Sequence, residues 1–121
     1  MRARAVNPRK KNQMTKTEEK FLVCDWFQAR FNHIRYESHT LRYGEQRYTP
    51  DFTAVRAEDG QVCHFEIKPA MVRAAYTDYA KAKLKTFVTE YEEYVFYLAV
   101  PDKKLVNGWS IEEISSRGQT G

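Results

Sequence analysis

The chain has 121 residues, which is the length of one domain with a single hydrophobic core. Apolar residues make up 42% and charged residues 30% of it, with many Tyr and Phe, so disorder over most of the chain is excluded. The longest apolar run, Tyr94 to Val100, is too short to cross a bilayer, and no signal-peptide core follows the basic start, so we expect a cytoplasmic protein with no membrane partner.

The first seventeen residues form a strongly basic segment, with six basic side chains and no acidic one, whereas the rest has 14 basic against 16 acidic residues. Residues 1–14 lack apolar periodicity, so we predict a flexible arm in front of one domain at residues 15–121. A cationic arm suits DNA, because neutralised phosphates release counterions. A merely solubilising tail is the alternative. The predicted DNA contacts are Arg2, Arg4, Arg9, Lys10, Lys11 and Lys16.

The domain starts with a predicted helix that ends near Phe31. Thr15 followed three residues later by Glu18 is the pattern of a capping box. Apolar residues then recur at helical spacing, from Phe21 to Phe27. One continuous first helix is therefore expected.

The next segment, residues 34–56, is predicted to form two strands. It is rich in Tyr and Thr, and Gly44 interrupts it, which indicates a turn between the strands. The pair Asp59-Gly60 then predicts a hairpin turn. A third strand follows from Gln61 to Lys68, so this strand and the one before it should pair as a hairpin.

Alternation along the third strand separates two faces. Cys63 and Phe65 belong to an apolar face, whereas His64, Glu66 and Lys68 share the other. Burial of the apolar face fixes the register, and it therefore fixes where the polar side chains point.

The last part of the domain predicts a long helix over residues 73–91 and an apolar strand over residues 94–100. Because this helix crosses between two strands of one sheet, the strands should be parallel neighbours. The predicted order is α-β-β-β-α-β, an α/β (α+β) domain. The core-facing stripe of the helix includes Tyr76, Tyr79 and Tyr91, while Lys81 and Lys85 lie on a solvated face that could also touch DNA.

Three residues of the predicted hairpin point to chemistry. Pro50-Asp51 is followed fifteen residues after the Asp by Glu66-Ile67-Lys68. A Glu/Asp-x-Lys triplet is expected roughly once by chance in a chain of this size. The triplet alone is therefore weak evidence for a functional site. The hairpin, however, can bring Asp51, Glu66 and Lys68 to one place. The alternative is a turn at Pro50 and an ordinary surface ion pair of Glu66 with Lys68.

These residue types suit phosphodiester hydrolysis, in which negative charge accumulates on oxygen and water must be deprotonated. Mg²⁺ or Mn²⁺ takes oxygen ligands and keeps several waters, so Asp51 and Glu66 are adequate protein ligands. Lys68 can orient the attacking water and offset charge on the phosphate. His64 shares this face and could contact phosphate or simply titrate at its edge.

The combination of Thr15-Lys-Thr-Glu18, Tyr48-Thr-Pro-Asp51 and Phe65-Glu66-Ile-Lys68, followed by a helix and an apolar strand, resembles the phage endonuclease I branch of the PD-(D/E)XK superfamily. It is also similar to the catalytic domain of TnsA-type transposon end-cleavage proteins. The likeness covers roughly residues 15–100. It implies a restriction-endonuclease-like core, with a mixed central sheet flanked by helices.

The same resemblance assigns further site residues. It implies that Glu18, on the first helix, joins Asp51 and Glu66 around the metal. Glu19 is the competing candidate for this position. The alternative for Glu18 is that it only caps the helix. The resemblance also implies the backbone carbonyl of Ile67 as a metal ligand.

The expected function is that of a metal-dependent DNA endonuclease, with branched DNA as a candidate substrate and a phage or mobile element as a candidate source. Symmetric cutting of two strands would favour a C2 homodimer, and a TnsA-like role would require a recombination or transposition partner. A DNA-binding or regulatory protein of the same fold without turnover is the alternative from a different class.

Overall fold

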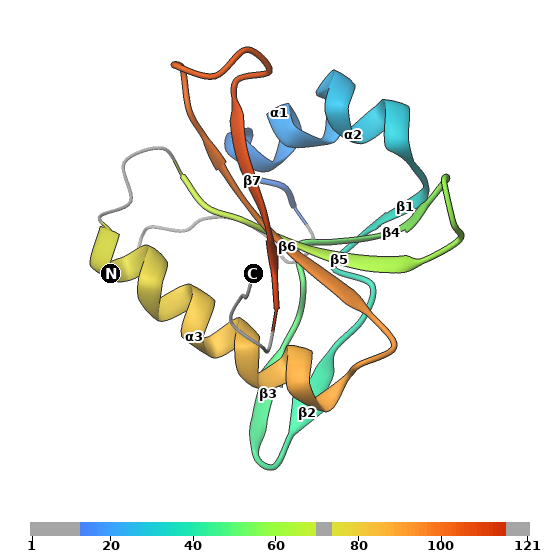
Figure 1. The fold of residues 1–121 in the computed structure, drawn as a ribbon, viewed down its shortest axis with the longest axis vertical. Helices are drawn as coiled ribbons and strands as arrows, with labels where there is room; N and C mark the ends of the chain where they lie inside the picture. The colour runs from blue at the N-terminus through green and yellow to red at the C-terminus, as the bar shows by residue number, and fades with distance from the viewer. Residues whose placement is uncertain (1–12, 70–73, 116–121) are drawn as a thin grey trace, which may run out of the picture.

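The computed structural model describes residues 13–69 and 74–115, and for residues 74–77 it describes the backbone only. A five-stranded mixed sheet lies at the centre, with helices on both sides and a separate two-stranded hairpin beside the longest helix (Figure 1). The elements are α1 (Lys16–Val23), α2 (Asp25–Arg30), β1 (Phe31–Tyr36), β2 (Leu41–Tyr43), β3 (Gln46–Tyr48), β4 (Phe52–Arg56), β5 (Val62–Ile67), α3 (Ala74–Glu90), β6 (Val95–Pro101) and β7 (Trp109–Ile114).

The main sheet has the strand order β1-β4-β5-β6-β7. β4 runs antiparallel to both of its neighbours, and β7 runs antiparallel to β6. β5 and β6, which α3 connects, are parallel, as the sequence predicts. The mixed α/β class is therefore confirmed, and residues 109–114 add a fifth strand to the sheet that the predicted order did not contain.

Both faces of the sheet are covered by apolar clusters. On one side α1 and α2 pack an aromatic cluster, in which the rings of Phe21 and Phe27 lie 4.5 Å apart and Phe27 lies 4.8 Å from Phe65. On the other side α3 and the β2–β3 hairpin enclose a second cluster around Phe87. Because β5 lies between the two clusters, its direction and register are fixed from both faces.

The first helical segment is broken at Cys24, so the prediction of one continuous helix is wrong. Cys24 has extended backbone angles, and it ends α1 and precedes α2. On a straight helix, Phe21 and Phe27 would point about 120° apart, since each residue turns the helix by about 100°. The break lets both rings enter the same cluster. Burial of both rings there compensates for the helical hydrogen bonds that are lost at the break.

The segment from Phe31 to Arg56 holds four strands, β1 to β4, where two strands were predicted. β1 starts directly at Phe31, and the turn predicted at Gly44 closes a separate hairpin, with Gly44 at a φ of 60°. This hairpin is an insertion into the predicted order. It buries Leu41 and Tyr48 against α3 rather than joining the main sheet.

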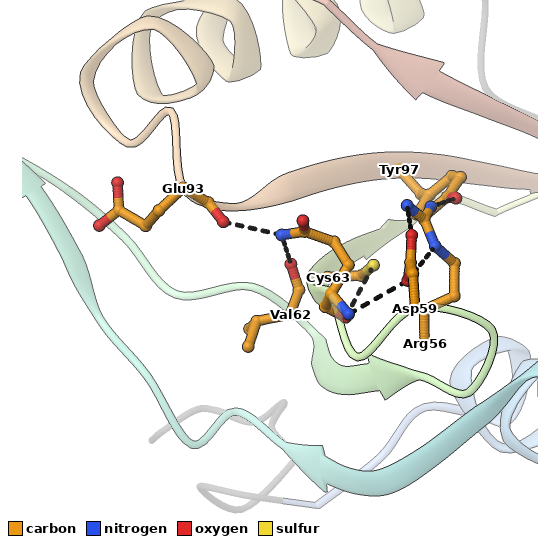
Figure 2. Close-up of polar contacts among 7 residues, drawn as sticks. Arg56, Asp59, Val62, Cys63, Glu93 and Tyr97 are labelled. Carbon is orange, nitrogen blue, oxygen red and sulfur yellow. Dashed lines mark hydrogen bonds and ion pairs between the residues drawn. The ribbon is translucent and has the colours of Figure 1, made fainter.

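The predicted turn at Asp59-Gly60 is confirmed, and it is held by an ionic cluster (Figure 2). The Arg56 guanidinium donates to both carboxylate oxygens of Asp59, at 3.1 and 2.9 Å, and to the hydroxyl of Tyr97 on β6 at 2.7 Å. This end of the hairpin thereby fixes the β4–β5 register, in which Phe52 faces Phe65. The same register places Asp51 beside Glu66 at the opposite end.

The core-facing stripe of α3 consists of residues such as Ala80, Leu84 and Phe87, which are buried, whereas Tyr79, which was predicted to belong to it, is 70% exposed. Tyr76 lies among the side chains that are not described. Of the helices in the described part of the chain, none is long and apolar enough to cross a membrane.

His64 lies in the interior rather than at the edge of an open polar face. It is fully buried, its Nδ1 lies 2.7 Å from the Thr53 hydroxyl, and its ring packs against Tyr94 and Phe96. Its Nε2 has no hydrogen-bond partner. The expected phosphate contact of His64 is therefore excluded by burial. Burial, with a smaller effect of nearby His39, lowers the pKa of His64 to about 4, so the ring is neutral.

We predict that His64 makes the fold sensitive to acid. The unfolded chain binds a proton at His64 below about pH 6.5, whereas the folded chain does so only near pH 4, so stability from this group is lost as the pH falls between these values. The destabilising effect of His64→Gln should shrink by about 2 kcal/mol between pH 7 and pH 4.5. Urea unfolding at both pH values measures it.

His33→Asn is the matched control for this measurement. His33 is exposed and has a φ of 54°, a conformation that Asn tolerates. Its variant should follow the pH dependence of the unmodified protein. An unchanged effect of His64→Gln at the two pH values would contradict the prediction.

Candidate active site

The candidate site lies where β4 and β5 separate. The two strands pair from Val55–Val62 to Phe52–Phe65, and Asp51 comes directly before β4. Pro50 has no amide hydrogen to continue the ladder. The Asp51 carboxylate instead accepts the amide hydrogen of Ile67 at 2.7 Å. This bond ties the Pro-Asp segment to the Glu-Ile-Lys segment.

Glu66 and Lys68 extend from the same face of β5, on the side of α3. The Glu66 Oε1 atom accepts a hydrogen bond from the Tyr48 hydroxyl at 2.8 Å, and its Oε2 atom lies 3.1 Å from Lys68 Nζ. The side chains of Glu66 and Lys68 are only 17% and 16% exposed. An ordinary surface ion pair would be much more exposed. The Glu66–Lys68 pair therefore differs from the surface ion pair that was the alternative.

Glu18 reaches the site from the first turn of α1. It is buried, and it completes the predicted capping box with Thr15. The Tyr36 hydroxyl also donates to Glu18 Oε1 at 2.8 Å. Glu18 acts on Asp51 through its charge and a side-chain hydrogen bond. Glu18 therefore both caps α1 and interacts with Asp51, whereas the competing candidate, Glu19, is exposed.

Burial has the largest electrostatic effect at the site, and neighbouring carboxylates add to it. Burial raises the pKa of Asp51 to about 8, with further increases from the charges of Glu66 and Glu18 and an opposing effect of the Ile67 amide. Burial and the charge of Glu66 also raise the pKa of the Tyr48 hydroxyl well above its usual value. Tyr48 therefore stays protonated and can only donate to Glu66.

The donor chemistry fits a hard divalent cation. Among the described residues, no three His, Cys, Asp or Glu side chains are gathered so as to hold a metal by themselves. Mg²⁺, however, is commonly held by one or two carboxylates with waters completing its shell. Asp51 and Glu66 provide two. The amide and carbonyl of a strand residue point to the same side, so the Ile67 carbonyl lies on the Asp51 side of β5.

The other predicted DNA contacts that the structure describes do not line the hollow at Glu66 and Lys68. Lys16 is exposed at the start of α1, Lys81 forms a 2.9 Å ion pair with Glu112 of β7, and Lys85 is exposed on α3. The remaining predicted arm residues, Arg2, Arg4, Arg9, Lys10 and Lys11, lie outside the described residues. Gln13 and Met14, which the prediction assigned to the arm, contact the domain through Tyr36 and the aromatic cluster.

Sequence reasoning missed four side chains around the site. Tyr36 and Tyr48 donate to Glu18 and Glu66, while Tyr79 and Lys83 of α3 line a hollow that also touches Lys68. Tyr79 and Lys83 are four residues apart, the spacing of one helix face. That spacing was a usable signal for the pair, whereas the contacts of Tyr36 and Tyr48 depend on tertiary structure.

Comparison with known proteins gives no relative: no family model, curated protein or solved structure matches the chain.

We predict that the site lowers the stability of the fold at neutral and alkaline pH. The folded chain keeps a proton on Asp51 up to about pH 8, whereas the unfolded chain loses it near pH 4, so stability falls as the pH rises between these values. Asp51→Asn keeps an acceptor for the Ile67 amide without the charge. It should raise the free energy of unfolding by on the order of 2 kcal/mol at pH 8 and by little at pH 4.

Chemical denaturation at pH 4, 6 and 8 in EDTA measures this gain. Glu58→Gln removes an exposed carboxylate from the β4–β5 turn and serves as the control, with no expected gain. A destabilising effect of Asp51→Asn at pH 8 would refute the proposed crowding.

Proposed function

We propose that this protein is a divalent-metal-dependent endonuclease that hydrolyses phosphodiester bonds in DNA. The carrying observation is the convergence of Glu18, Asp51, Glu66 and Lys68 from three separate segments at the point where β4 and β5 separate. Burial, together with the charges of Glu66 and Glu18, raises the pKa of Asp51 to about 8, and strongly perturbed groups of this kind are concentrated at functional sites.

The fold supports a restriction-endonuclease-like core in the proposal. Leaving out the inserted β2–β3 hairpin, the order from α1 to β6 is helices, three strands, a helix and a strand, as the resemblance implies. Asp51 lies directly before β4, and Glu66-Ile67-Lys68 lies at the end of the adjacent strand β5. The fold alone does not define an activity. The proposed activity is therefore supported mainly by the four side chains of the candidate site.

Each residue has a definite role in the proposed reaction. A bound Mg²⁺ or Mn²⁺ would polarise the phosphate and lower the pKa of a bound water. Asp51 and Glu66 supply carboxylate oxygens, and Glu18 holds Asp51 from the side of α1. Lys68, kept near Glu66 at 3.1 Å, is placed to orient the attacking water and offset charge on the phosphate.

The proposal predicts Mg²⁺-dependent nicking or cutting of DNA. With plasmid and four-way-junction substrates, cleavage should occur with Mg²⁺ and stop with EDTA. Asp51→Asn and Lys68→Met should each lower the rate at least about 100-fold, since loss of a positioned acid or base commonly costs 10²–10⁴-fold. Lys103→Met, in the exposed β6–β7 loop, is the matched control for Lys68 and should retain full activity.

The same assay separates the two acidic residues of α1. Glu18→Gln should reduce cleavage, while Glu19→Gln should not. A non-cleaving DNA-binding module would instead show salt-sensitive DNA binding without cleavage, unchanged by Asp51→Asn. That result, or cleavage that persists in EDTA, would overturn the proposal.

A further inference from the structure

A groove runs outward from Glu66 and Lys68 between α3 and the β2–β3 hairpin, and it consists of two hollows. The inner hollow, of about 130 Å³, has Glu66, Lys68 and Tyr48 on one side. The outer hollow, of about 500 Å³, reaches Arg47 on β3. Both hollows are lined by Tyr79 and Lys83 of α3, so they adjoin each other. The groove therefore leads directly into the candidate active site.

The groove is suited to an anion along its length. Lys83 extends over the Tyr48 ring, with its Nζ 5.8 Å from the ring centre, and Arg47 and Lys83 contribute two cations to the outer hollow. The described lining of that hollow includes no acidic residue, although Glu45 and Asp78 lie next to lining residues in the sequence. Lys68 stands at the inner end.

The hairpin provides a second indication of an anionic ligand. Arg42 and Arg47 are directly paired across β2 and β3, on the face of the ribbon opposite to Leu41 and Tyr48, and Arg47 also lines the outer hollow. Like charges directly opposite each other destabilise a two-stranded pair. Phosphate groups of a nucleic acid would relieve this repulsion.

Tyr79 gives the groove an aromatic surface. It is 70% exposed, while its neighbour Ala80 and the later residue Leu84 are buried, so Tyr79 lies off the core-facing stripe of α3. A single exposed aromatic residue is common on protein surfaces. This one lines both hollows beside Lys83 and next to the Glu66–Lys68 pair. Alternating aromatic and cationic groups along a groove are typical of sites for unpaired nucleotides.

The size of the groove favours a single strand over a duplex. A volume of about 500 Å³ is in the range of pockets that enclose one small ligand, which is room for a nucleotide or two. The inner hollow of about 130 Å³ has room for a few waters at about 30 Å³ each.

We infer that this groove binds a single-stranded segment of the DNA substrate, with Tyr79 stacking on an unpaired base and Lys83 and Arg47 holding the adjacent phosphates. The inference rests on the proposed nuclease function and narrows its substrate class to DNA with unpaired nucleotides at the scissile position, such as forks, flaps, gaps or single strands.

Binding in EDTA tests the inference without cleavage. Fluorescence anisotropy would compare a labelled oligo-dT strand with a blunt duplex of the same length, and the single strand should bind more tightly. Tyr79→Ala should weaken binding of the single strand about 5- to 100-fold, because the contribution of one stacked base is of that size. Tyr79→Phe should bind like the unmodified protein. Tyr43→Ala is the matched control, because Tyr43 is also exposed on the hairpin but does not line the described groove.

Salt dependence tests the cationic residues. Lys83→Gln and Arg47→Gln should each reduce the slope of log binding constant against log salt for the single strand by about 0.7, the value for one lost phosphate contact. Lys103→Gln should leave the slope unchanged. Circular dichroism melting of each variant shows whether it folds.

The outcomes separate the inference from the proposed function. If Tyr79→Ala and Tyr79→Phe bind single strands alike, or if blunt duplex binds as tightly as the single strand, the inference is wrong even where Mg²⁺-dependent cleavage is observed. If Tyr79→Ala alone loses single-strand binding, the groove is established even where no cleavage occurs, and only the nuclease function fails.

Discussion

The candidate site depends on one hydrogen bond, from the Ile67 amide to the Asp51 carboxylate at 2.7 Å. It forms just beyond the last β4–β5 pair, Phe52 with Phe65, where a side-chain oxygen accepts the Ile67 amide hydrogen. The bond fixes Asp51 beside Glu66, and the ionic cluster at Arg56 fixes the register of the same hairpin from its other end. The two aromatic and apolar clusters then hold β5 from both faces.

The candidate site brings several acidic side chains together in a partly buried position, which does not favour the stability of the fold. Asp51 lies beside Glu18 and Glu66 in a partly buried position, with Lys68 as the nearby cation. The consequence is a raised Asp51 pKa and lower stability at neutral pH. Such a cluster becomes favourable once a divalent cation binds, which is why stability and the proposed activity oppose each other here.

The sequence predicted the parts of the molecule that local patterns determine. The turn at Asp59-Gly60 and the alternation along β5 were sufficient to bring Asp51 near Glu66, and the capping box at Thr15 marked the start of α1. Other features depend on tertiary packing. The break at Cys24 follows from the need to bury Phe21 and Phe27 together. Alternation could not tell that His64 is covered by the second cluster, because both faces of β5 are buried. The groove at Tyr79 exists because an inserted hairpin packs on α3.

The central claim is that Asp51 and Glu66 form a cation site, and its most direct measurement is calorimetric titration of Mn²⁺ at pH 7 in two buffers of different ionisation enthalpy. Because the pKa of Asp51 is about 8, cation binding must displace its proton. The account predicts one binding event that releases close to one proton and disappears in Asp51→Asn. Absence of binding, or binding without proton release that persists in Asp51→Asn, would contradict it.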